Sequence, residues 1–92
     1  MKYVLTKPYT FEGETVEEIE FNLEEMTGET ISRAKRKFAT SGEFSMGLVT
    51  TDLDYCAYVV AELLGKPIEF MTQMPARDYC RIGMMVSAFL SV

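Results

Sequence analysis

Hydrophobic and polar residues alternate along the first part of the chain, in two runs separated by Glu12 and Gly13. A period of two is typical of a β-strand with one buried face. The pattern predicts a β-hairpin over about residues 3–23. Pro8 cannot donate a hydrogen bond to the ladder, so it indicates an edge or a bulge in the first strand. The expected inward positions are Tyr3, Leu5, Tyr9 and Phe11 in the first run and Thr15, Ile19, Phe21 and Leu23 in the second.

The next segment has the features of a surface helix over about residues 28–40. Thr27 is a suitable N-cap, and Glu29 precedes the basic cluster RAKRK, which is the charge order that the helix dipole favours. Gly42 is placed to end the helix. Its apolar stripe is narrow, so we expect one edge of the helix to pack on the hairpin. The stripe consists of Ile31, Ala34 and Phe38.

The run DLDYCAYVVAELLG predicts a central helix over about residues 52–64. Thr51 with Asp54 resembles a capping box at its start, and Gly65 followed by Pro67 marks its end. Apolar residues cover most of its circumference, so we expect it to pack on more than one side. The preceding residues 41–49 form a predicted loop whose order the pattern leaves open, although it contains Phe44, Met46 and Leu48.

The last predicted helix covers about residues 75–90, after a PIEFMTQM stretch that has room for one helical turn. At about 100° per residue, its core stripe comprises Tyr79, Ile82, Val86, Phe89 and Leu90, with Met85 on the shoulder. The opposite side is uncharged and comprises Cys80, Met84, Ser87, Ala88 and Ser91. A surface helix normally carries Lys or Glu there. The helix is therefore either sandwiched within the protein or in contact with a partner, and the sequence favours neither alternative.

Together these elements predict an α+β fold, in which an N-terminal β-hairpin is followed by three α-helices in a small, mainly helical single domain. The length of 92 residues suits one core, and a hydrophobic share of 48% can fill it. The net charge of −5 disfavours nonspecific contact with nucleic acid or anionic membrane. No apolar run approaches the ~20 residues that span a bilayer, and no secretory signal is evident, so we expect a cytoplasmic protein.

Candidate catalytic chemistry is sparse. Histidine, the commonest general base and metal ligand, is absent, and so are the glycine motifs that bind phosphates or hold nucleophiles. Asp54 and Glu62 lie two helical turns apart, but a capping role for Asp52 and Asp54 is the simpler interpretation. Cys56 and Cys80 sit in apolar helical pattern and are expected to be buried thiols. We therefore expect no enzyme activity, no cofactor and no metal site.

Charged clusters offer two further alternatives. The glutamates between residues 12 and 25 lack the spacing of a calcium loop and are explained by a solvated strand face. The basic cluster at residues 33–37 could contact phosphate, but no aromatic residues interleave with it for base stacking. A solvated helix face is the simpler interpretation of that cluster.

Several short segments, in this order, resemble the small phage tail assembly chaperones encoded just upstream of the tape measure gene. They are LTKPYTFEG, IEFNLEEMTG, LLGKPIEFMTQMPARDY and MMVSAFL, and the resemblance covers about residues 3–90. Its elements are a K-P-Y-x-F-x-G opening at residues 7–13, an I-x-F with L-E-E-M-T-G at residues 19–28, and a P-A-R-D-x helix start at residues 75–79. None of these is a catalytic signature; their order and spacing carry the resemblance.

The resemblance implies a protein of the host bacterial cytoplasm that binds the long, apolar tape measure protein, keeps it soluble while the tail tube assembles, and is absent from the virion. Members are often made in two lengths by a frameshift, and the longer form recruits the tail tube protein. Self-association is left open. On this interpretation the tape measure protein contacts the last helix through Met84, Met85, Ser87, Ala88, Phe89 and Leu90.

Two alternatives from other classes remain open. One is a structural tail component that is retained in the virion. The other is a small nucleic-acid-binding regulator that uses the basic helix.

Overall fold

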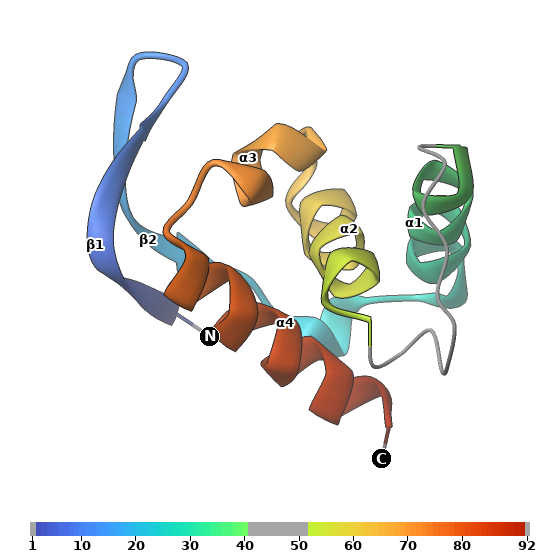
Figure 1. The fold of residues 1–92 in the computed structure, drawn as a ribbon. Helices are drawn as coiled ribbons and strands as arrows, with labels where there is room; N and C mark the ends of the chain where they lie inside the picture. Colours follow the sequence, from blue (N-terminus) through green and yellow to red (C-terminus); the bar gives the residue numbers. More distant parts are fainter. Residues whose placement is uncertain (1, 41–51, 92) are drawn as a thin grey trace.

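A computed structural model describes residues 2–40 and 52–91 and confirms the α+β fold. An antiparallel hairpin precedes the helices (Figure 1). Four α-helices, rather than the predicted three, occur in the described part, because the stretch after Pro67 forms a short helix of its own. The elements are β1 (Lys2–Phe11), β2 (Glu14–Glu20), the 3-10 turn η1 (Leu23–Glu25), α1 (Gly28–Thr40), α2 (Leu53–Leu64), α3 (Ile68–Thr72) and α4 (Ala76–Leu90).

The turn of the hairpin has two residues, as the sequence predicts. Phe11 pairs with Glu14, and the two residues between them have positive φ angles of 50° at Glu12 and 82° at Gly13. Positive φ at both positions is the geometry that matches the right-handed twist of the flanking strands. Glycine adopts it freely, whereas a glutamate does so at some cost.

A bulge interrupts the ladder around Pro8. Val4 pairs with Glu18 and Tyr9 pairs with Val16, so residues 5–8 of β1 face a single residue of β2. The extra residues shift the alternation of β2 by one position. Consequently Val16 lies on the same face as Tyr9, whereas Thr15 is exposed, and the prediction that Thr15 faces inward is wrong.

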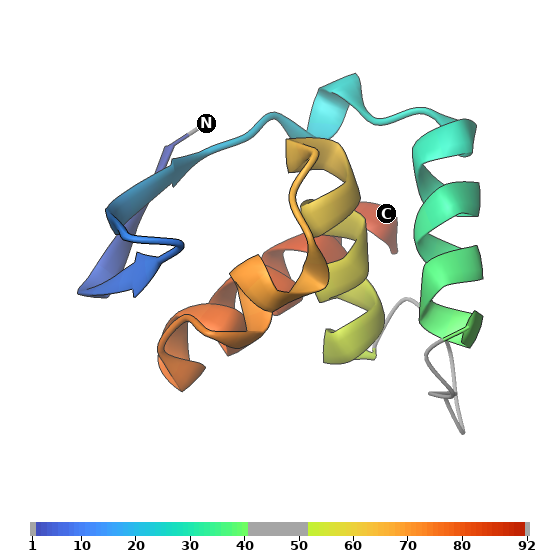
Figure 2. The ribbon, with the colours of Figure 1, turned by 90° about the horizontal axis from the view of Figure 1, so that it is seen from above.

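Helix α2 is the centre of the core, packed on more than one side as predicted (Figure 2). Its N-cap is Asp52, whose carboxylate accepts hydrogen bonds from the backbone N–H groups of Asp54 and Tyr55 at 2.9 and 3.3 Å. The capping-box prediction for Thr51 falls outside the described residues. Gly65 ends the helix in the left-handed conformation (φ 69°), as the sequence indicates.

Helix α1 packs against α2. The prediction that it packs against the hairpin is therefore wrong. Its buried Phe38 ring meets the rings of Tyr55 and Tyr58 edge to face, with centroids 5.7 and 5.8 Å apart. Figure 1 shows α1 and the hairpin on opposite sides of α2. The aromatic pair on α2 supplies the surface that the narrow stripe of α1 needs. Thr27 caps the helix as expected, because its hydroxyl accepts the Thr30 N–H at 3.4 Å.

The predicted loop at residues 41–49, with Gly42, Phe44, Met46 and Leu48, lies outside the described residues.

The predicted second strand was too long, because β2 ends at Glu20 and Leu23 begins the η1 turn. Leu23 is nevertheless buried, as its apolar character suggests.

Candidate partner-binding surface

Helix α4 approaches α2 closely along its inner face. Ile82 and Val86 are fully buried, and Gly83 lies between them against Leu53. A Cβ atom at position 83 would lie 2.7 Å from the Cδ2 atom of Leu53. The missing side chain therefore lets the two helices come together at this point.

A buried carboxylate at the start of α4 holds the hairpin. Asp78 is inaccessible to solvent, and its Oδ1 accepts hydrogen bonds from the Tyr3 hydroxyl at 2.8 Å and the Thr6 N–H at 3.0 Å. Its Oδ2 accepts the Thr6 hydroxyl at 2.9 Å. Thr6 belongs to the bulge, so the N–H that binds Asp78 comes from the segment where the β ladder is interrupted.

The charge of Asp78 is stabilised by these bonds. Burial raises the pKa of the Asp78 carboxyl, but the hydrogen bonds from Thr6 and Tyr3, together with the positive charge of Arg81, bring the pKa below its ordinary value. The group is therefore an ionised structural anchor at neutral pH.

Asp78 is not among the residues that the sequence pattern predicts to be important. The signal was its spacing, because Asp78, Ile82 and Val86 follow one another at intervals of four residues and share the inner side of the helix. A charged residue in line with a core stripe indicates a buried polar partner.

The outer face of α4 is left uncovered by the described residues. Met84, with 57% of its surface exposed, and Ala88 are both exposed. The other predicted partner-binding residues, Met85, Ser87, Phe89 and Leu90, are half-buried, and the three apolar ones pack against the core. The six residues thus divide into an outer pair and a set at the margin of the core.

One of the two cysteines differs from the prediction. Cys56 is fully buried in α2, whereas Cys80 is exposed on the outer side of α4. The expectation of two buried thiols is therefore wrong for Cys80, because the elements next to it leave its side of α4 open to solvent.

A pocket of about 310 Å³ opens beside Cys80, where α4 meets the start of α2 and the segment after α3. The hydroxyl of Tyr79 donates a hydrogen bond to Oδ1 of Asp54 at 2.6 Å, and both residues line the pocket. The lining residues are Asp54, Thr72, Met74, Ala76, Tyr79 and Cys80.

Comparison with known protein families identifies a family for this chain. A family model described as "Phage tail assembly chaperone proteins, E, or 41 or 14" matches residues 2–91. The chain belongs to this family of phage tail assembly chaperones. No curated protein and no solved structure matches.

In this member of the tail assembly chaperone family, two of the segments that carry the resemblance meet in space. The opening LTKPYTFEG contains the bulge with Thr6, and the PARDY helix start contains Asp78, which binds it. Tyr9 of the opening also donates a hydrogen bond to the Phe70 carbonyl oxygen at 2.6 Å. These segments therefore have a structural role in joining the hairpin to the helices.

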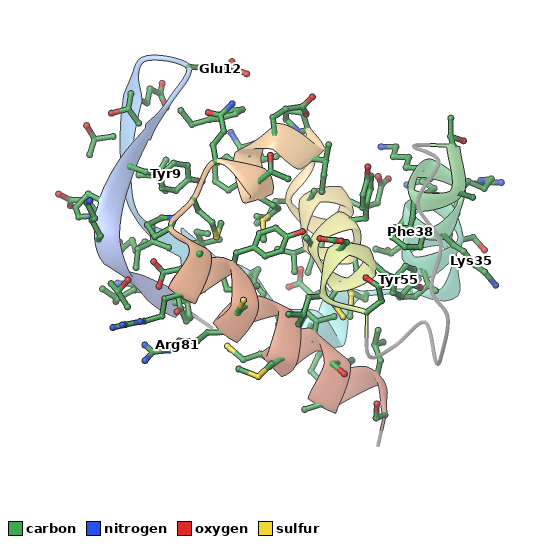
Figure 3. All side chains as sticks on the ribbon, in the orientation of Figure 1. Tyr9, Glu12, Lys35, Phe38, Tyr55 and Arg81 are labelled. Atoms are coloured by element: carbon green, nitrogen blue, oxygen red, sulfur yellow. The ribbon has the colours of Figure 1, made fainter. Side chains whose placement is uncertain are left out.

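The other candidate clusters are engaged within the fold. Glu62 forms ion pairs with Lys37 at 2.6 Å and Arg33 at 3.8 Å, while Asp54 binds Tyr79. The carboxylate pair suggested by sequence spacing thus has two separate structural roles. Arg33 also pairs with Glu29 at 2.6 Å, so part of the basic cluster is directed to acidic partners within the chain. Lys35, another member of the cluster, is labelled in Figure 3.

Within residues 2–40 and 52–91, no group of acidic or cysteine side chains is arranged so that it could hold a metal ion. No helix in the same residues has the length and apolar character needed to cross a membrane.

Proposed function

We propose that this tail assembly chaperone binds the tape measure protein through the outer face of α4 and keeps it soluble in the host bacterial cytoplasm while the tail tube assembles. It acts by binding and performs no chemical reaction. It leaves the assembly and is absent from the finished virion.

The outer face of α4 after Arg81, which is uncharged, is the observation that carries this proposal. Exposed Met84 and Ala88 provide an adaptable apolar surface and a site of close approach, which suit the apolar face of another helix. The half-buried apolar residues beside them, Met85, Phe89 and Leu90, widen the same surface. Burying it against an amphipathic helix would remove apolar area from water on both partners.

Co-expression with the product of the tape measure gene from the same genome tests the proposal. We expect the wild-type chain to keep that product soluble and to co-elute with it on size exclusion. The Met84→Glu and Ala88→Glu double variant should remain folded, because both positions are exposed, but should no longer co-elute. Burying two unpaired charges in the contact would oppose binding.

A matched control adds the same charge elsewhere. Ser32→Glu with Ala39→Glu places two carboxylates at exposed positions of α1 and should bind like the wild type. Full co-elution of a folded Met84 and Ala88 double variant would contradict the assignment of the surface. Finding the chain in purified virions by mass spectrometry would instead support a structural tail component.

A further inference from the structure

The pocket beside Cys80 and the outer face of α4 form one continuous strip. Cys80 lines the pocket and is exposed, and Met84 and Ala88 follow it at intervals of four residues on the same side of the helix. A helix lying along this strip would place side chains over Met84 and Ala88 and one further side chain at the mouth of the pocket. The pocket lining is mainly apolar, and its one carboxylate, that of Asp54, already accepts a hydrogen bond from Tyr79.

The charges that accompany the strip are positive. Arg77 and Arg81 are exposed on α4, and Arg81, which is labelled in Figure 3, also lies near Asp78, where its positive charge helps to lower the pKa of that carboxyl. The only acid of α4, Asp78, is buried and bound to β1. The solvent-facing charge of α4 is therefore positive, in a chain whose net charge is −5.

We infer that the pocket takes one large apolar side chain from an amphipathic helix of the tape measure protein, whose acidic residues lie beside Arg77 and Arg81. This inference rests on the proposed function and specifies which helices of that protein are chosen. Apolar contact along the strip supplies the attraction, the pocket fixes the register, and the two arginines select helices with acidic margins.

The two cysteines allow a direct test. Cys80 lies in the pocket and is exposed, whereas Cys56 is buried, and burial raises the pKa of its thiol to about 11. N-ethylmaleimide should therefore modify Cys80 of the free chain and spare Cys56. In the purified complex with the tape measure protein, we expect the rate of Cys80 modification to fall by about tenfold, measured by mass spectrometry, since the inserted side chain excludes the reagent.

Two sets of variants test the pocket and the charges separately. Ala76→Leu fills the pocket from an exposed lining position, and Arg77→Gln with Arg81→Gln removes the positive charge. We expect the Ala76 variant and the arginine variant each to bind about tenfold more weakly than the wild type at low salt. Raising the salt concentration should lower the affinity of the wild type until it approaches that of the arginine variant. Lys35→Gln with Arg36→Gln makes the same charge change on exposed positions of α1 and should bind like the wild type.

Three results would overturn the inference. If both folded variants bind with wild-type affinity and the rate of Cys80 modification is unchanged in the complex, the pocket and the arginines do not contact the partner. The proposed function would then still stand. If Cys80 becomes better protected as the concentration of the chain alone rises, a second copy of this chain is the occupant of the pocket. Failure of the wild-type chain to bind the tape measure protein at all would reject the proposed function and the inference with it.

Discussion

Helices α1 and α4 both pack against α2, yet their outer faces differ. The outer side of α1 carries the basic cluster at residues 33–37, part of which pairs with Glu29 and Glu62. The outer side of α4 has no charge after Arg81 and exposes Met84. A charged, ion-paired surface is well solvated by water, whereas an apolar surface is stabilised when a partner covers it and removes it from water.

The inner contacts of the two helices also differ. Helix α1 is held by Phe38 among aromatic rings and by ion pairs at the surface. Helix α4 is held by close approach at Gly83 and by the buried carboxylate of Asp78. Substitutions at these positions should separate the four kinds of contact.

Phe38→Ala should have the largest effect on stability. It removes a buried ring that contacts both Tyr55 and Tyr58, so we expect the free energy of unfolding to fall by about 4 kcal/mol. Urea unfolding followed by circular dichroism measures the change, and exposed Lys35→Ala serves as the control. A loss similar to that of the control would show that α1 is not held by this ring.

Asp78→Ala should come next, at about 3 kcal/mol, because it leaves the Tyr3 hydroxyl and the Thr6 N–H without their acceptor. Asp78→Asn keeps part of the acceptor and should cost less. The same urea titration measures both. Equal stability of the alanine variant and the wild type would show that the hairpin is held without this carboxylate.

The stability of the wild type should also depend on pH through Asp78. Its pKa is lowered in the folded state, so the stabilisation is present above the unfolded pKa of about 3.9 and is lost as the pH falls through the folded value. Urea titrations from neutral pH into this acidic range should therefore show a shallower decline for Asp78→Asn. Parallel declines would assign the acid sensitivity to other carboxylates.

Gly83→Leu should destabilise the chain by about 2 kcal/mol, because its side chain must displace Leu53 or separate α4 from α2. Gly83→Ala should be nearly neutral. Its gain in helix propensity of about 1 kcal/mol offsets a small movement of the flexible end of the Leu53 side chain. Thermal unfolding of the two variants distinguishes a close contact from a loose one, which would tolerate both substitutions.

Glu62→Gln should have the smallest effect, below about 1 kcal/mol, although it removes both ion pairs to α1. Lys37 and Arg33 are largely solvated, so water replaces much of the lost interaction. Unfolding at low and high salt measures the effect, which should shrink as salt rises. A loss as large as that of Asp78→Ala would mean that these surface pairs behave as buried ones.

Much of the fold could be predicted from local patterns. The turn at Glu12 and Gly13, the central helix and its end at Gly65 all follow from residue preferences and periodicity. The inward face of β2 could not be predicted completely, because the bulge near Pro8 changes the alternation that placed Thr15 inside. The element on which α1 packs was also predicted wrongly, because a narrow apolar stripe shows that a helix is packed but does not show against which element.

The candidate surface was predicted in part. A helical wheel distinguishes the two sides of α4, but only the arrangement of neighbouring elements shows that Met84 and Ala88 are exposed while Phe89 and Leu90 reach the core. The pocket could not be predicted, because its lining comes from α2, the end of α3 and α4. Such a site exists only after the helices have packed.

The bond between the first strand and the last helix also constrains the order of events during synthesis. Thr6 and Tyr3 are separated from Asp78 by 72 and 75 positions along the chain. Contacts this distant in sequence close a long loop and are entropically costly to form first. The hairpin can form early as a local unit, but it cannot dock until the ribosome has released the start of α4. The native position of the hairpin is therefore reached only after both of these segments have left the ribosome.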